Sequence, residues 1–292
     1  MTAAAPVRYE IRAMSFAEIL DMGFRLLRDH FVLVVGLGAT LQVPLALLQA
    51  WSGGKLGIAP PPGATFISGA ITVIALLAVG PIVGAAVTYA IGDAYVGQPP
   101  TIGQALRRAF AIVLPLTATM LLVALLVLFV TLALLLPSLV AFLAPGVLPA
   151  PPRLLLVGGL VLSFFAWIHL WLGYLVITQV MMLESTFGRA ALRRSRVLMR
   201  GNRLRGAGIT FLGALIVAVL GGVLQFALGY VPIVGAAAEG VAQAAGTAYT
   251  AAVLVVLYFD IRCRKEAFDL EHLATLVTRA SDAAPALAPS TG

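Results

Sequence analysis

The stretch AFAIVLPLTATMLLVALLVLFVTLALLL, which runs from Ala109 to Leu136, decides the fold class. It contains no charged residue, and a helix needs roughly 20 apolar residues to cross the ~30 Å hydrocarbon core of a bilayer. Because lipid offers the backbone no hydrogen-bond partner, an uncharged run of this length is expected to be a helix. We predict that the helix ends near Leu136, since the prolines that follow favour a loop: Pro137, Pro145, Pro149, Pro151 and Pro152.

Further uncharged tracts of at least nineteen residues lie on both sides of this stretch: Phe31–Gln49, Leu56–Gly92, Leu154–Leu183, Gly206–Ala238 and Gly240–Phe259. The 292-residue chain is 61% hydrophobic and 11% charged, with a mean hydropathy of +1.03, which excludes an ordinary soluble domain. No tract shows the polar–apolar alternation of a transmembrane β-strand. The sequence therefore predicts an all-α integral membrane bundle with six transmembrane helices.

The nineteen basic residues predict the orientation of this bundle. Seventeen lie at the two chain ends and in the second and fourth connecting segments, whereas the first and third segments hold only Lys55 and Arg153. Short loops rich in basic residues stay in the cytoplasm. We therefore predict a multi-pass protein with both termini cytoplasmic.

Four segments follow from this topology. We predict an N-terminal cytoplasmic arm at 1–13, a six-helix membrane domain at 14–260, a cytoplasmic amphipathic helix at 261–279 and a disordered tail at 280–292, which is rich in Ala, Pro and Ser. Cys263 is the only cysteine, which excludes a disulfide framework and a cysteine-ligated zinc site. We expect no metal and no cofactor.

The cytoplasmic segments resemble one another. Ala105–Arg108 (ALRR) recurs as Ala191–Arg194, and Ser15–Arg28 has apolar residues at helical spacing between charged ones. Short amphipathic helices with basic faces lie in the headgroup plane. Our hypothesis is three repeats of one unit, an interfacial helix followed by a helical hairpin; such repeats build transporters but also inert bundles.

An acid closes each proposed hairpin on the cytoplasmic side: Asp93, Glu184 and Asp260. These boundary acids have two interpretations. Each could pair with a neighbouring arginine, such as Asp260 with Arg264 one helical turn later. Alternatively, the three could converge on a cation.

His169 lies near the middle of the Leu154–Leu183 tract, where a polar ring costs free energy. One interpretation is a neutral histidine that hydrogen-bonds across helices to Gln225 or Gln243. The other is a proton relay or substrate contact formed by these residues.

The fourth connecting segment contains a stripe of arginines on one helical face: Arg189, Arg193, Arg196 and Arg200. Such a stripe would meet anionic lipid headgroups, or it would serve only to fix the topology. Nucleic acid is not expected as a partner, because the stripe lies at the bilayer and has no aromatic residues on which bases could stack.

Five stretches carry a resemblance to a known family: Ser15–Asp21 with Phe24–Leu26, Ile102–Arg108, Met182–Glu184 with Ala191–Ser195, Leu198–Arg203, and Leu257–Leu270. Together they resemble bacterial polytopic proteins described as similar to the membrane domain of glycerophosphoryl diester phosphodiesterase. The resemblance implies a membrane module, because the separate catalytic barrel of those enzymes and its ligands have no counterpart here. The preference for arginine over lysine, with abundant Ala, Gly and Leu, suits a bacterial chain.

The sequence contains none of the motifs HExxH, GxSxG, GxxxxGK[ST] or GxGxxG, so we assign no catalytic residue and favour a protein that is not an enzyme. Our first hypothesis is a non-catalytic module, scaffold or accessory subunit of the bacterial plasma membrane, whose partners are the bilayer, anionic headgroups and other membrane or cytoplasmic proteins. The second is a transporter or lipid-handling protein. The third, an enzyme acting on glycerophospholipid, rests on the family name alone.

Overall fold

The computed structural model describes residues 12–56, 59, 62–74, 79–96, 101–144, 151–270 and 274. Within these residues every regular element is a helix, which confirms the all-α prediction. The predicted terminal segments lie largely outside them, at 1–11 and 275–292. The helices are α1 (Phe16–Asp29), α2 (Phe31–Ser52), α3 (Ala64–Ile74), α4 (Gly80–Tyr95), α5 (Ile102–Ala111), α6 (Val113–Leu143), α7 (Pro152–Gly173), α8 (Ile177–Leu183), α9 (Gly188–Met199), α10 (Arg203–Leu228) and α11 (Pro232–Glu266).

Five helical stretches among the described residues are long and apolar enough to cross a membrane: Phe31–Ser52, Val113–Leu143, Pro152–Leu183, Arg203–Leu228 and Pro232–Glu266. The tract Leu56–Gly92, predicted to be one more span, instead contains the two shorter helices α3 and α4. Pro81 lies in the first turn of α4, where a proline is tolerated because its missing N–H has no helical partner. The six-helix count is therefore not confirmed.

Several boundaries differ from the prediction: the Leu154–Leu183 tract forms α7 and α8, and α11 begins at Pro232 rather than after Ala238. Helix α6 continues through Pro137 to Leu143, and the Ser138 hydroxyl beside the proline donates a hydrogen bond to the carbonyl of Leu135 at 2.6 Å. The predicted cytoplasmic helix at 261–279 begins within α11, which runs without interruption to Glu266 and ends where Ala267 has a φ of 51°. At 261–266 the chain thus continues α11; residues 268–270 after Ala267 are helical again, and most of the rest of the predicted helix lies outside the described residues.

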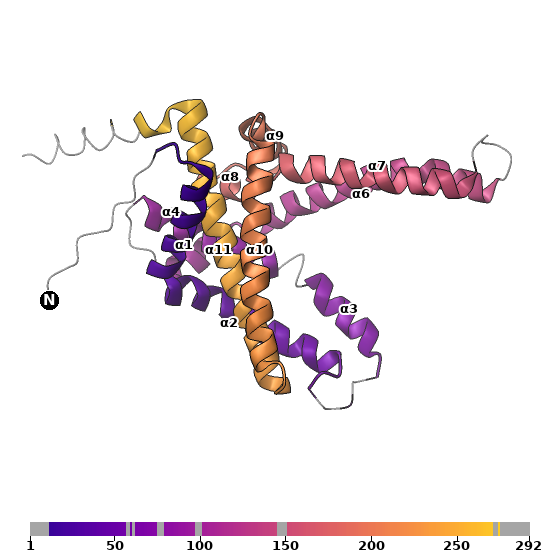
Figure 1. Cartoon of the computed structure of the whole chain (residues 1–292), viewed down its shortest axis with the longest axis horizontal. Helices are drawn as coiled ribbons and strands as arrows, with labels where there is room; N and C mark the ends of the chain where they lie inside the picture. The colour runs from indigo at the N-terminus through magenta and orange to yellow at the C-terminus, as the bar shows by residue number, and fades with distance from the viewer. Residues whose placement is uncertain are drawn as a thin grey trace, which may run out of the picture.

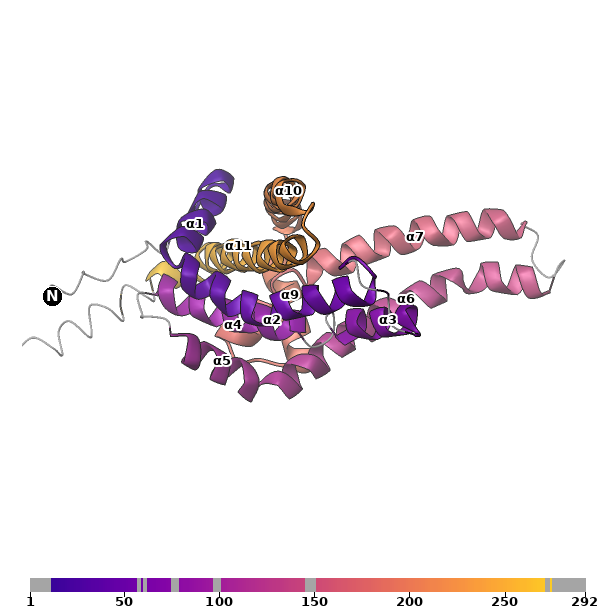
Figure 2. The same ribbon diagram turned by 90° about the horizontal axis from the view of Figure 1, so that it is seen from below.

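Helix α11 is the centre of the bundle, and small residues bring its neighbours close. A Cβ on Gly240 would lie 2.6 Å from the Val43 Cα of α2, and one on Gly38 would lie 3.1 Å from Ala244. Such contacts let membrane helices approach each other closely. In contrast, α6 and α7 pack against each other and extend away from the other helices (Figures 1 and 2).

Three amphipathic helices, α1, α5 and α9, each precede a long apolar helix, in the order that the repeat hypothesis requires. Ser15 and Glu18 form a capping box at the start of α1. Hydrogen bonds from the Ser15 backbone N–H and from Arg12 lower the pKa of Glu18 to about 2. The three-fold repeat itself stays a prediction, because the first unit returns through α3 and α4 rather than through one long helix.

Candidate functional site

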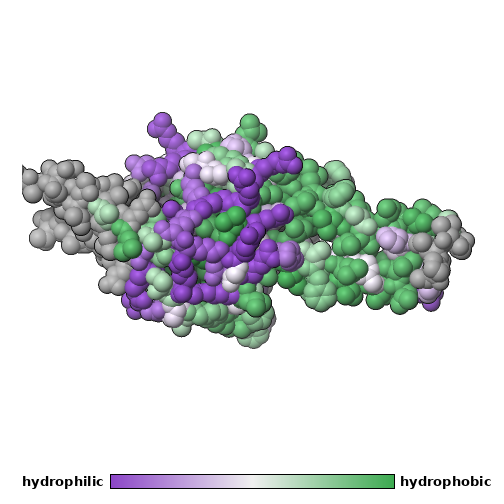
Figure 3. All heavy atoms as spheres, turned by 90° about the horizontal axis from the view of Figure 1, so that it is seen from above, coloured by the Kyte–Doolittle hydropathy of each residue, from purple (hydrophilic) through white to green (hydrophobic). Residues whose placement is uncertain are grey.

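Hydrophilic side chains gather at one end of the bundle, where α9 lies beside the start of α10 and the end of α11 (Figures 1 and 3). We call this end the polar face. It contains the three boundary acids and the arginine stripe, and the long helices run from it toward apolar surface.

Asp260 anchors the polar face. Its carboxylate is only 1% exposed and accepts hydrogen bonds from the Met14 backbone N–H at 2.7 Å and from Arg264 Nε at 3.1 Å. Arg205 Nη2 lies 3.2 Å from the second carboxylate oxygen, and both arginines also donate to the Met14 carbonyl. The predicted pairing of Asp260 with Arg264 is confirmed. The carboxylate also ties Met14, just before the N-cap of α1, and Arg205, near the start of α10, to α11.

Glu184 and Asp93 also pair with arginines. Arg194 of α9 donates to Glu184 through Nε and Nη2, at 2.9 Å each, and reaches Glu266 of α11 through Nη2 at 2.9 Å. These hydrogen bonds, the one to Glu266 first, raise the pKa of Arg194. Arg108 Nη1 lies 2.9 Å from Asp93.

The boundary acids therefore act as partners of arginines. In the part of the chain that the structure describes, no group of three or more His, Cys, Asp or Glu side chains could hold a metal ion. Asp93, Glu184 and Asp260 each pair with a different arginine and do not converge on one cation site.

The arginine stripe on α9 is largely unpaired. Arg189, Arg193 and Arg200 are exposed, and no carboxylate among the described residues forms an ion pair with them. Arg196 contacts Tyr174 instead: its guanidinium carbon lies 4.8 Å from the ring centre, and Nη2 donates to the phenol oxygen. Lys265 holds the end of the helix by donating to the carbonyls of Val197 and Arg200, at 2.7 and 2.6 Å.

The intramembrane polar set predicted from the sequence does not come together. His169 is exposed on α7, and its ring nitrogens lie 3.1 and 3.0 Å from Arg203 Nη1. Gln225 is exposed near the far end of α10, and Gln243 donates to Glu239 at 3.4 Å. The predicted partners of His169 were wrong, because α7 diverges from α10 and the two helices approach each other only near the polar face (Figure 1).

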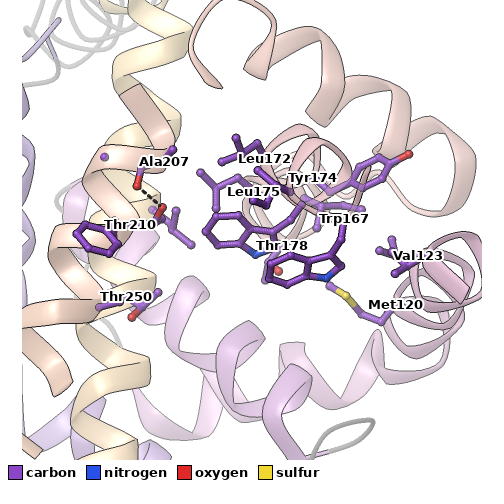
Figure 4. Close-up of a pocket in the computed structure, with 18 of the residues that line it drawn as sticks. Met120, Val123, Trp167, Leu172, Tyr174, Leu175, Thr178, Ala207, Thr210 and Thr250 are labelled. Atoms are coloured by element: carbon purple, nitrogen blue, oxygen red, sulfur yellow. Dashed lines mark hydrogen bonds between the residues drawn. The ribbon is translucent and has the colours of Figure 1, made fainter. Parts of the chain in front are cut away.

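An apolar cavity of about 940 Å³ occupies the fork between α6–α7 and α10–α11. In Figure 4, Ala207, Thr210 and Thr250 form one side, Met120 and Val123 lie opposite, and Trp167, Leu172 and Leu175 lie between them. The only polar contact drawn there is the 3.1 Å hydrogen bond from the Thr210 hydroxyl to the Ala207 carbonyl. The cavity is suited to apolar chains.

Two arginines, Arg196 and Arg203, lie beside Gly173 and Tyr174 without lining the cavity themselves. Tyr174, which holds Arg196, lines the cavity. A Cβ on the adjacent Gly173 would lie 3.7 Å from both Arg196 Cγ and Arg203 Nη2. In the sequence analysis, Arg203 was one of the basic residues that predict the orientation, and no site was assigned to it. The aromatic residues Trp167, Trp171 and Tyr174 lie on the helix face opposite His169 and could have indicated this cavity.

A second cavity, of about 620 Å³, contains one of the predicted residues, Gln243. Its lining also includes Gln42 and Gln179, which sequence reasoning missed. Both lie inside uncharged tracts, so the rule that singled out Gln243 could have found them.

No family model matches this chain, and neither a curated protein nor a solved structure is similar to it.

Proposed function

We propose that this chain is a non-catalytic module of a bacterial plasma membrane that binds an anionic phospholipid, with its polar face and both termini in the cytoplasm. The observation that carries the proposal is that Arg196 and Arg203 lie beside Gly173 and Tyr174, and that Tyr174 lines the 940 Å³ apolar cavity. The asymmetric distribution of basic residues supports the orientation. The family resemblance of the sequence supports a bacterial membrane module without a catalytic domain.

The chemistry of the site fits the two parts of a phospholipid. The cavity between α6–α7 and α10–α11 would take acyl chains, and guanidinium groups bind phosphate through paired N–H donors. Tyr174 and His169 hold the two arginines in place, so less side-chain freedom is lost when a headgroup binds. Neither arginine forms an ion pair with a carboxylate of the described residues, so their charges are available to an anion.

The exposed arginines of α9 would act more generally. Arg189, Arg193 and Arg200 would attract anionic headgroups of the surrounding bilayer, at about 1 kcal/mol per basic residue near the surface. This attraction would hold α9 in the headgroup plane. Other membrane or cytoplasmic proteins that bind the same face would complete a scaffold or accessory role.

The test uses purified protein in nanodiscs that contain equal amounts of phosphatidylglycerol and phosphatidylcholine. Native mass spectrometry after extraction should show phosphatidylglycerol retained in preference to phosphatidylcholine. The double variant Arg196→Gln/Arg203→Gln should reduce that preference by about tenfold or more, because each cation contributes about 1 kcal/mol.

The control is Arg25→Gln, which removes an arginine of α1 that pairs with Asp21 far from the cavity. This variant should retain phosphatidylglycerol as the unchanged protein does. Equal retention of both lipids by the unchanged protein, or an undiminished preference in the double variant, would contradict the proposal.

A further inference from the structure

The second cavity lies among α2, α4, α8, α10 and α11, and many of the side chains that line it are polar although the surrounding helices are apolar. Every residue that lines it lies in one of the uncharged tracts, yet its lining contains three glutamines and four threonines: Gln42, Gln179, Gln243, Thr88, Thr178, Thr247 and Thr250. Polar side chains inside such helices lose free energy unless they find hydrogen-bond partners. Packing alone gives no reason for seven of them to gather around one space.

Three of these side chains have buried polar atoms without a partner: Gln42 Oε1, Thr88 Oγ1 and Gln179 Oε1. Their residues are only 7%, 1% and 1% exposed. The other end of the Gln42 amide is fixed, because its Nε2 donates to Thr247 Oγ1 at 3.1 Å. Three residues of the lining, from three different helices, therefore carry two amide oxygens and one hydroxyl whose hydrogen-bonding capacity no described protein group uses.

The charge of the lining limits what could occupy it. No Asp, Glu, Lys or Arg is among the described residues that line the cavity. A buried ion would therefore have no counter-charge, and the loss of its hydration would not be compensated. The unused groups are chiefly acceptors, so a fitting occupant is uncharged and supplies hydrogen-bond donors.

We propose that this cavity binds a small uncharged solute that carries several hydroxyl or N–H donors. The volume lies within the usual range for small-molecule pockets. The site shares with the lipid cavity only the wall formed by Thr178, Ala214, Thr250 and Leu254, and it does not depend on the lipid proposal. Polar sites within the membrane interior are typical of transport proteins, so this site gives the transporter hypothesis a specific place in the structure.

Thiol labelling can test the site, because Cys263 is the only native cysteine. In a Cys263→Ser background, Thr88→Cys places a thiol at the cavity, while Thr119→Cys places one at an equally buried threonine of α6 outside it, each being 1% exposed. A hydrophilic methanethiosulfonate reagent should label Thr88→Cys and not Thr119→Cys. Glycerol, with three hydroxyl groups, should slow the labelling by about half at its dissociation constant.

1-Propanol, which has the same carbon skeleton and one hydroxyl, is the matched solute and should protect far less than glycerol at equal concentration. Gly84→Leu should slow labelling and weaken protection, because a Cβ there meets nothing within 4 Å and the added side chain would occupy part of the cavity that Gly84 lines. If Thr88→Cys does not fold, Thr247→Cys probes the same lining. Equal labelling of the cavity and control thiols, or equal protection by the two solutes, would overturn the proposal.

Discussion

Helix α11 and the α6–α7 hairpin are both apolar, yet α11 is largely buried and the hairpin is largely exposed. In the most apolar 18-residue window of each span, 72% of residues are buried in α11, but only 6% in α6. The mean hydropathy of these windows runs the other way, at 1.6 for α11 and 3.0 for α6. The most hydrophobic helix is thus the most exposed one, as expected where lipid is as apolar as leucine and gives large side chains no reason to be inside.

Residue size explains the difference better than hydropathy does. Helix α11 presents small residues such as Gly240, Ala244 and Ala248 to its neighbours, and all three are buried. Exposed Leu and Phe side chains cover α6, including Phe129 and Phe142. Consequently α11 contributes to the polar face and to both the apolar and the second cavity, whereas α6–α7 contributes to the apolar cavity but not to the second one.

The largest effect is expected from Asp260→Ala, which removes the carboxylate that holds the end of α11. Loss of one partner from a buried charge network should destabilise the protein by about 4 kcal/mol. The matched change, Asp93→Ala, breaks the partly exposed pair with Arg108 and should cost less than about 1 kcal/mol. Unfolding of both variants by SDS titration in mixed micelles would measure the difference; equal losses would mean that the α11 anchor is no stronger than a surface pair.

A second test compares a buried residue near the start of α6 with an exposed residue in the middle of the same helix. Leu116 is fully buried and Phe129 is 71% exposed. Leu116→Ala should therefore lower stability by about 3 kcal/mol, whereas Phe129→Ala should change it by less than about 0.5 kcal/mol. Thermal unfolding followed by tryptophan fluorescence would compare them, and a large effect of Phe129→Ala would indicate that a partner covers the hairpin.

The smallest effect is expected from alanine substitutions of one glycine in α11 and one in α7. Gly240→Ala would place a Cβ 2.6 Å from the Val43 backbone, and the forced separation of α2 and α11 should cost about 2 kcal/mol. Gly158→Ala meets nothing within 4 Å and should be neutral or stabilising by up to about 1 kcal/mol, since alanine favours helix. Size-exclusion profiles after a heat step would rank the two; a stable Gly240→Ala would refute the close contact between α2 and α11.

Much of the architecture could be predicted from local pattern. The amphipathic helices at Ser15–Arg28, Ile102–Arg108 and Ala191–Arg194 were recognisable because their periodicity lies within one segment. The pairing of Asp260 with Arg264 was predictable because residues four apart on a helix are neighbours. The division of Leu56–Gly92 into α3 and α4 was not anticipated, because a hydropathy count does not register where Pro81 begins a new helix.

The candidate sites were less predictable. Gln243 was recognised as a polar residue in an apolar helix, but its neighbours in the cavity, Gln42 and Gln179, come from helices distant in sequence. His169 was assigned partners in α10 and α11 on polarity alone. Its actual contact, Arg203, depends on the angle at which α7 leaves the bundle.

The sequence by itself determined an all-helical chain, long apolar segments, and basic amphipathic helices gathered at one end of them, because these features depend on local composition and helical periodicity. Only the tertiary structure decided that the less hydrophobic α11 is central, that Arg196 and Arg203 both lie beside Gly173, and that Gln42, Thr88 and Gln179 line one cavity. The physical reason is that helix positions are set by close contacts between small residues far apart in the chain, such as Gly240 against Val43. Those contacts leave no periodic signal in the sequence of either helix.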